Sequence, residues 1–513
     1  MTVRWSALII GSLFGAPLSS ALAAAPDVVR DLAGRVGPIV GRASTCPDIA
    51  EGRVQTIVEK FREAIRQASS NDGERDQLTR AFNGYIAEGR SRGGPSAANC
   101  STAERQLAEL ERSLIESGPA TTAGSLPVNA PTATTGAVIA SPVRGVTDRE
   151  IRLGIVMPFS GIRKETGRQM KLGIETAFNR VNDAGGINGR KLRLIAADDA
   201  YDPTRTLAAM TQLYEKDKVF GFIGNMGTAN NAVAIPYALE RRALFFAPYS
   251  GSAVVRRDPP DRYVFNYRAS YAEETAAIVH YLMKVKRIPA KQIAVFAQND
   301  AYGDDGANGV AKAFRALGIT DPIIRYGFPR GTLEVDDAVG KLKAQTKPPI
   351  KAVIMIATDR AAAKFIEKTH EAAPGLIYAN ISAVGSSSLA AELKLLGTKY
   401  TNGVIVTQGV PSVAGYSSLV LDYKNALAKY AAGEAPDYTS LEGYIAATIL
   451  IQALKQTNPL DTERLVDTLE SMRSLDLGLG TPLAFGRAEH QASHKIWGTT
   501  LDETGTYQPI ELE

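Results

Sequence analysis

Five short segments of the chain combine glycines, hydroxyls and amides, which are groups that hold a small polar molecule without transforming it. Each follows a stretch predicted to be a buried β-strand, and in parallel sheets ligands bind beyond the carboxyl ends of the strands. Glycine lets backbone N–H groups approach a ligand, and the start of a helix favours an anionic group. Taken singly, each segment is also compatible with an ordinary strand-to-helix loop. Their succession predicts a binding cleft, built from Pro158–Gly161, Gly224–Thr228, Pro248–Ser252, Gln298–Gly303 and Ala357–Asp359.

Catalytic and metal-binding patterns are weak by comparison. The chain has no P-loop, no GxSxG and no HExxH motif. His490 and His494 are four residues apart, a spacing that metals can use on a helix, but no helix is predicted there. The cluster Asp198, Asp199 and Asp202 is typical of a strand-end turn followed by a helix cap before Pro203. We therefore expect a protein that is not an enzyme and that has no metal site and no cofactor.

The elements that position these segments alternate between strand and helix from Asp148 onward. Ile151–Met157 and Leu192–Ala196 are apolar and β-prone, and the helical stripe Met170–Val181 lies between them. Such alternation predicts parallel sheets flanked by helices with right-handed crossovers. Residues 148–513 exceed one doubly wound sheet, so two α/β lobes are expected.

The first 25 residues predict export. Arg4 supplies a positive start, Ala7–Ala16 an apolar stretch, and Ser19–Ala25 small residues for cleavage. The apolar stretch is shorter than the ~20 residues that a membrane span needs. We expect residues 1–25 to be a signal peptide and the mature chain to be periplasmic, without insertion into the membrane.

Residues 26–118 predict a small helical domain, with apolar positions at helical spacing. The chain's two cysteines, Cys46 and Cys100, both lie here and predict a disulfide, two free thiols being the alternative. In the chain-entropy model such a bridge stabilises a unit with a small core by roughly 4 kcal/mol. Residues 119–147 are rich in Thr, Ala, Gly and Pro and predict a flexible linker.

The overall composition is that of an ordinary folded protein. Apolar residues make up 45% and charged residues 22% of the 513 residues, which excludes global disorder. The net charge of +4 is spread among mixed signs, so no nucleic acid is expected as a partner.

Four segments resemble one protein family. They are Asp183–Arg190 (within the glycine-hinged stretch Val181–Pro203), Tyr263–Tyr271, Gln298–Gly306 and Ser440–Tyr444. Together they resemble the type I periplasmic binding proteins, which are the receptors of branched-chain amino acid and related ABC importers, over about 148–509. The resemblance implies a two-lobed fold of two doubly wound parallel sheets joined by three crossovers, near Arg268, Gln408 and Gly480. Lobe 1 would comprise about 148–268 and 409–480, and lobe 2 about 269–408 and 481–513.

The same resemblance implies where a ligand is held. The loops containing Thr228 and Tyr249, Ser250 and Gly251 would grip the ligand's carboxylate, and Tyr302 would form an aromatic wall from lobe 2. Ser160, Glu165, Arg268 and Asp359 are weaker candidates, and solvated surface roles are expected for Arg268 and Lys164.

One segment departs from the family pattern. Amino acid receptors of this type place an acid from lobe 2 against the ligand's ammonium, whereas the corresponding loop here, Asn380–Gly385, has none. A buried ammonium needs a compensating charge. Either Asp359 or Glu165 supplies it, or the ligand is not an α-amino acid.

The function implied is an exported, monomeric solute receptor that delivers a small polar ligand to an inner-membrane ABC permease. The alternative is a sensing or regulatory protein that uses the same lobes, with the N-terminal helical domain docking a partner.

Overall fold

The structure is a computed structural model that describes residues 26–47, 49–69, 71–92, 100, 103–104, 106–107, 110 and 143–512. The predicted signal peptide at 1–25 and most of the predicted linker, 119–142, lie outside these residues. The chain divides into two compact units, Met1–Gly136 and Ala137–Glu513.

The first unit contains three described helices: α1 (Pro26–Ala43), α2 (Glu51–Ala68) and α3 (Asp72–Arg92). Their apolar faces meet in one core, in which the rings of Phe61 and Phe82 stack with centroids 4.4 Å apart. Glycines let α1 and α3 approach closely: a Cβ on Gly41 would lie 2.2 Å from the carbonyl oxygen of Ile86. Cys46 and Cys100 form a disulfide, as the sequence predicted.

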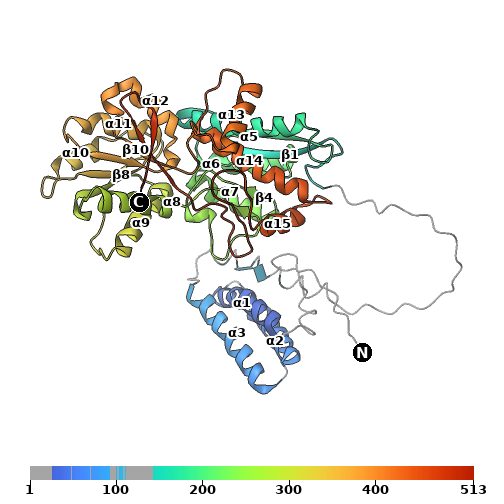
Figure 1. The fold of residues 1–513 in the computed structure, drawn as a ribbon. Helices are drawn as coiled ribbons and strands as arrows, with labels where there is room; N and C mark the ends of the chain where they lie inside the picture. Colours follow the sequence, from blue (N-terminus) through green and yellow to red (C-terminus); the bar gives the residue numbers. More distant parts are fainter. Residues whose placement is uncertain are drawn as a thin grey trace. The chain divides into compact units, whose positions relative to one another are not determined.

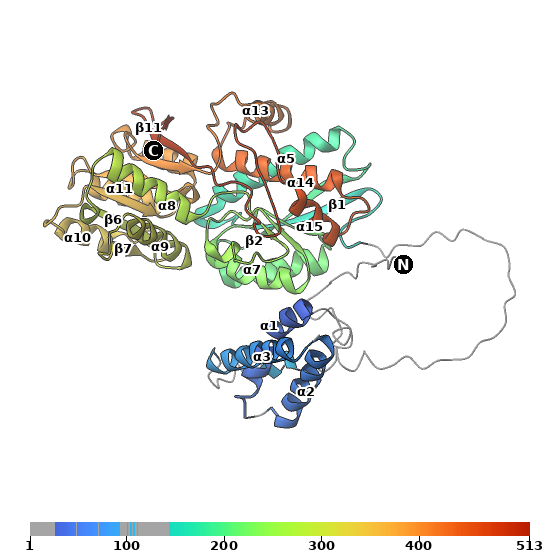
Figure 2. The same ribbon diagram turned by 60° about the horizontal axis from the view of Figure 1, so that its bottom comes forward.

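The second unit has two lobes (Figures 1 and 2), and lobe 1 is built on a five-stranded parallel sheet. The strand order is β2-β1-β3-β4-β5. Apolar side chains alternate between its two covered faces, as expected for a buried parallel sheet. Phe246 packs beneath α5 and α14, and Phe245 beneath α6 and α7. The strands are β1 (Glu150–Met157), β2 (Lys191–Asp198), β3 (Gly221–Ile223), β4 (Leu244–Phe246) and β5 (Val264–Phe265); the helices are α5 (Lys164–Asp183), α6 (Pro203–Thr211), α7 (Thr228–Glu240), α13 (Ser418–Tyr430), α14 (Tyr438–Gln456) and α15 (Thr462–Ser471).

Lobe 2 is built on a seven-stranded sheet with the order β12-β11-β10-β9-β8-β6-β7. Five strands are parallel, while β11 and β12 add an antiparallel edge. Helices α8 and α9 cover one face, and α10, α11 and α12 cover the other. The strands are β6 (Ile293–Gln298), β7 (Ile324–Phe328), β8 (Ala352–Ile356), β9 (Ile377–Asn380), β10 (Ile405–Gln408), β11 (Trp497–Leu501) and β12 (Tyr507–Ile510); the helices are α8 (Tyr271–His280), α9 (Ala301–Ala316), α10 (Asp336–Ala344), α11 (Asp359–His370) and α12 (Ser386–Leu396).

Three crossovers join the lobes, and the third differs from the sequence prediction. The chain crosses between β5 and α8, beside Arg268, and between β10 and α13, after Gln408. The third crossing follows Ser493 instead of lying near Gly480, because Leu483 and Phe485 are buried in the core of lobe 1. The N–H of Ser493 donates to the carbonyl oxygen of Tyr267 (3.0 Å), which places the third crossover beside the first.

Within the ranges described, no helix is long and apolar enough to cross a lipid bilayer.

Candidate functional site

The loops at the carboxyl ends of the strands of the two lobes face each other and are in contact. Arg330, after β7, donates from Nη2 to the carbonyl oxygen of Tyr201 (2.6 Å) and to Asn230 Oδ1 (2.8 Å) in lobe 1. The amide of Gln298 lies 3.4 Å from the hydroxyl of Tyr201. These contacts place Gln298 of the predicted segment Gln298–Gly303, together with Arg330, directly against lobe 1.

Two buried hydroxyls mark the lobe 1 side of the cleft. Thr228 begins α7, and its Oγ1 lies 3.1 Å from Ser250 Oγ in the loop after β4. Both residues are at most 2% exposed, and Tyr271 OH lies 3.5 Å from Ser250 Oγ. The first N–H groups of a helix have no partner within it and favour an anion. This hydroxyl pair at a helix start is suited to a carboxylate.

Gly251, next in the same loop, is required by packing. A Cβ at this position would lie 2.3 Å from the ring of Tyr271. The glycine thus allows the start of α8 to lie against the hydroxyl pair.

Tyr249 reaches across to lobe 2. Its hydroxyl donates to the carbonyl oxygen of Ser382 (3.3 Å), and the guanidinium of Arg268 lies 4.4 Å from the centre of its ring. Burial raises the pKa of Tyr249 to about 12, so the phenol is neutral at physiological pH.

Tyr302, on the first turn of α9, is buried against the other aromatic residues. Its ring meets Tyr271 edge-on with centroids 5.4 Å apart, and its hydroxyl donates to the carbonyl oxygen of Ala357 (3.3 Å). Burial raises the pKa of Tyr302 well above its ordinary value. Tyr302 is therefore a neutral, buried aromatic residue at the start of α9.

Arg163, which the sequence analysis did not select, crosses the cleft from lobe 1 to lobe 2. It precedes α5, and its Nη1 donates to Asp359 Oδ1 (2.8 Å) and to the carbonyl oxygen of Val384 (2.7 Å). Its Nη2 donates to the carbonyl oxygen of Ala383 (3.0 Å). The side chains of Arg163 and Asp359 are 1% and 5% exposed. Burial by itself lowers the pKa of Arg163, but Asp359 reverses this effect and holds that pKa above its ordinary value.

The prediction that Arg268 occupies the solvated surface was wrong. Its side chain is 1% exposed, its Nε lies 3.1 Å from Glu442 Oε1, and its Nη2 donates to Ser382 Oγ (2.7 Å). Glu274 completes this cluster by accepting from the backbone N–H of Ser382 (2.7 Å) and from Thr407 Oγ1 (2.5 Å). Burial lowers the pKa of Arg268, but the charge of Glu442 more than compensates. The cluster joins the first crossover to α14, α8 and the loop after β9.

Ser160 and Glu165 are not brought into the cleft cluster. Ser160 is exposed, and its Oγ donates to Asp198 Oδ2 (2.6 Å), which ties the loop after β1 to the end of β2. Glu165 accepts from Arg168 on the next turn of α5 (2.7 Å), and this hydrogen bond lowers the pKa of Glu165. Glu165 is thus already paired outside the cleft.

The two lobes are closed on each other. Beside Arg268 they enclose a cavity of about 10 Å³, which is close to the least that one water molecule requires. Any larger solute must enter by an opening of the lobes about the three crossovers. The cavity is lined by Tyr249, Arg268, Ser382, Ser386, Gln408, Gly409, Val410, Tyr438, Thr439 and Glu442.

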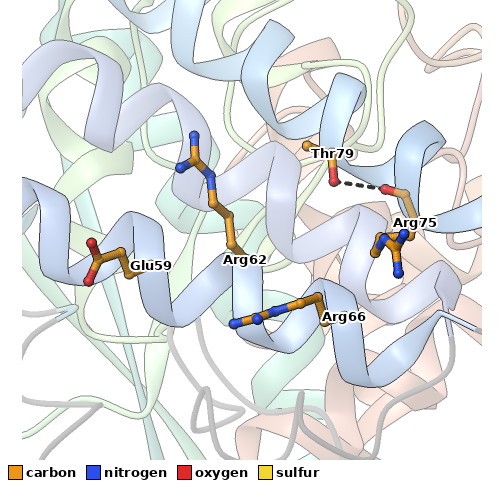
Figure 3. Close-up of a pocket in the computed structure, with 5 residues that line it drawn as sticks. All are labelled: Glu59, Arg62, Arg66, Arg75 and Thr79. Atoms are coloured by element: carbon orange, nitrogen blue, oxygen red, sulfur yellow. Dashed lines mark hydrogen bonds between the residues drawn. The ribbon is translucent and has the colours of Figure 1, made fainter. Parts of the chain in front are cut away.

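A second, open groove lies on the helical unit (Figure 3). It is lined by side chains of α2 and α3, which are the exposed Glu59, Arg62, Arg66 and Arg75 and the half-buried Thr79. Arg66 pairs with Glu63, and Arg75 with Asp72, each within its own helix. Exposed ion pairs of this kind contribute little to stability. The groove is open to solvent, unlike the cavity between the lobes.

The residues considered for metal or acid–base chemistry have structural partners. His490 stacks on Phe265 at 3.9 Å, whereas His494 contacts Glu273. Asp202 caps α6 by accepting from the N–H of Thr204 (2.9 Å), as predicted. In the part of the chain that the structure describes, no three His, Cys, Asp or Glu side chains are grouped to hold a metal ion.

Comparisons with known proteins agree with this architecture. A family model described as a periplasmic binding protein matches residues 150–506. An amino acid binding protein of Pseudomonas aeruginosa is 24% identical over 339 residues, covering 65% of this chain and 87% of that protein.

Two solved structures resemble this fold. The structure of a possible leucine/isoleucine/valine-binding protein from Rhodopirellula baltica is 33% identical with a TM-score of 0.67, covering 73% of this chain and 98% of that one. A fatty acid ABC transporter substrate-binding protein from Thermomonospora curvata has a TM-score of 0.65 at 20% identity, covering 72% and 94% of the two chains. The chain therefore belongs to the periplasmic binding protein family and has its two-lobed type I fold.

Proposed function

We propose that this protein is an exported receptor that binds a small carboxylate-bearing solute between its lobes and delivers it to an ABC importer. The observation that carries the proposal is the buried hydroxyl pair of Thr228 and Ser250 at the start of α7, where lobe 1 meets Tyr271 of lobe 2. The named ligands of two similar proteins, an amino acid and a fatty acid, share a carboxylate.

Closure of the lobes provides the mechanism. A bound solute stabilises the closed state by the contacts that it makes with both lobes at once. Arg163, Tyr249 and Arg330 already join the lobes by hydrogen bonds. The inner-membrane permease would then receive solute from the closed form, in the periplasm, with the receptor acting as a monomer.

Thr228→Val is expected to weaken solute binding by about 10- to 100-fold, because a hydrogen bond to a charged group contributes about 1.5–3 kcal/mol. Binding is measured by calorimetry with a ligand found in a thermal-shift screen of amino acids and other carboxylates, since a ligand raises stability by mass action. Thr211→Val is the matched control, because that exposed hydroxyl donates only to its own helix at Leu207. Unchanged affinity in Thr228→Val would place the carboxylate elsewhere.

Deletion of residues 26–142 is expected to leave the affinity for the same ligand unchanged, within about twofold. Every residue assigned to the cleft lies in the second unit, which has its own cores. Calorimetry on the truncated chain checks this expectation. Loss of binding with the fold retained would show that the helical unit belongs to the site, and would favour the sensor alternative.

A further inference from the structure

The guanidinium of Arg163 lies on the oxygen atoms that a ligand's ammonium would need. Three acceptors from lobe 2 surround it: Asp359 Oδ1 and the carbonyl oxygens of Val384 and Ala383, at 2.7–3.0 Å. Both carbonyls belong to the loop after β9, which carries no acid. A cation supplied by the protein itself therefore occupies this side of the cleft.

The other carboxylates near the cleft are engaged as well. Glu442 pairs with Arg268, and Asp300 pairs with Arg330. Glu274 accepts from Ser382 and Thr407. A second cation placed beside Arg163 would find Asp359 already neutralised, and burying a charge without a partner of its own is strongly unfavourable.

The hydroxyl pair has the opposite electrostatic surroundings. Arg256 lies directly behind it and donates from Nη1 to the carbonyl oxygens of Ser250 (2.8 Å) and Ser252 (3.2 Å). Its Nε and Nη2 donate to Gln491 Oε1 (2.7 Å) and to the carbonyl oxygen of Arg268 (2.6 Å), so these acceptors are all uncharged oxygens. Burial and the charge of Arg268 lower the pKa of Arg256 to about 10, so Glu273 and Glu274 compensate its charge only in part and this end of the cleft favours an anion.

Buried tyrosine rings lie next to these groups: Tyr271 contacts Ser250 and Tyr302, and Tyr201 and Tyr249 lie near Arg163. Tyr249, Tyr271 and Tyr302 are each at most 4% exposed, and Tyr201 is 7% exposed. Such rings suit an apolar body with a single polar end.

We infer that the cleft selects an apolar monocarboxylate without an α-ammonium group, and that Arg163 is the residue that excludes amino acids. The inference rests on the proposed function, because it names the ligand class of the same cleft. Arg163 acts by neutralising Asp359, the acid that the sequence analysis considered as a partner for an ammonium.

The test compares solutes that differ only in the ammonium group, by calorimetry on the full mature chain. The pairs are leucine with 4-methylpentanoate, and phenylalanine with 3-phenylpropanoate. At least one of the two acids is expected to bind about 100-fold more tightly than its amino acid, the ratio expected from burying an uncompensated charge. Preferential binding of the amino acid overturns the inference and leaves the proposed function standing. Binding of neither member of either pair also overturns the inference, and failure of every carboxylate in the thermal-shift screen overturns the proposed function.

Variants of Arg163 test its role separately. Arg163→Ala leaves Asp359 without a partner. In this variant the ratio of the affinity for the acid to that for its amino acid is expected to fall at least 10-fold, through a gain in amino acid binding. Adding Asp359→Asn should abolish that gain, and Arg163→Lys should keep the original preference. Arg168→Ala is the matched control, since Arg168 is exposed on α5, the helix that follows Arg163, and pairs with Glu165 and Glu434. An unchanged preference in a folded Arg163→Ala variant would overturn the assignment to Arg163, and the selectivity of the unmodified protein tests the ligand class even if that variant does not fold.

Discussion

Arg268→Met is expected to lower the free energy of unfolding of the two-lobed unit by about 3–5 kcal/mol, which is the cost of leaving a buried charge without its partner. Arg268 and Glu442 are both nearly inaccessible to solvent and approach to 3.1 Å. The side chain of Met fills part of the same space but leaves Glu442 uncompensated. Urea unfolding followed by circular dichroism measures the change.

The loss of unfolding free energy in Arg268→Met should depend on pH. Burial raises the pKa of Glu442 even with Arg268 present, and removing the arginine raises it further. A carboxyl whose pKa is higher in the folded state binds more protons there, so stability falls as pH rises above its unfolded pKa of about 4.3. The free energy of unfolding of the Arg268→Met variant should therefore be closer to that of the unmodified protein at pH 5 than at pH 8.

A second substitution checks the assignment of this effect to charge. Adding Glu442→Leu to Arg268→Met removes the stranded carboxylate and should restore part of the lost stability. The exposed pair of Arg168 and Glu434 provides the comparison, with an expected effect below about 1 kcal/mol for Arg168→Ala. A deficit that is independent of pH and is not relieved by the double substitution would point to lost packing instead.

Gly173→Ala is expected to destabilise the same unit by about 3 kcal/mol, at the upper end of the usual cost of overpacking. Gly173 lies on α5 where this helix crosses α14, and a Cβ there would be 1.8 Å from the carbonyl oxygen of Ser440. The same is true of Gly443 on α14, where a Cβ would lie 2.5 Å from the carbonyl oxygen of Met170. A single methyl group must therefore push the two helix backbones apart.

The identical substitution at Gly340 is the control. Gly340 lies within α10 and is exposed, and nothing beyond its own stretch of helix comes within 4 Å of where a Cβ would stand. Alanine there should therefore stabilise the helix by up to about 1 kcal/mol. Thermal and urea unfolding of both variants give the comparison. Equal effects at the two glycines would show that helix propensity decides the result and that the contact between α5 and α14 is not tight.

Local patterns in the sequence were sufficient for most elements of the fold. The apolar run Ile151–Met157 is observed as β1, which begins one residue earlier, and the two cysteines pair as predicted. These features depend on side-chain periodicity and on residue type, which neighbours in the chain determine. The third crossover, which the family resemblance placed near Gly480, was placed too early, because the burial of Leu483 in lobe 1 depends on contacts with residues far away in the sequence.

The candidate site was predictable only as a set of loops. The sequence located Thr228, Tyr249, Ser250 and Tyr302 at strand ends, and in the structure Thr228 contacts Ser250 while Tyr271 contacts both Ser250 and Tyr302. It did not reveal Arg163, although the neighbouring Lys164 and Glu165 were considered. A charged residue beside exposed polar residues is usually solvated, and nothing near Arg163 in the sequence shows that Asp359 lies within its reach.

The sequence by itself determined the two α/β lobes, the glycine-hinged stretch Val181–Pro203 that marks the family, and the absence of an acid from Asn380–Gly385. The tertiary structure alone decided which charges meet in the cleft. Arg163 and Asp359 are 196 residues apart, and Arg268 and Glu442 are 174 apart. Electrostatic pairing depends on distance in space and on burial, and both arise only when the crossovers bring the two sheets face to face.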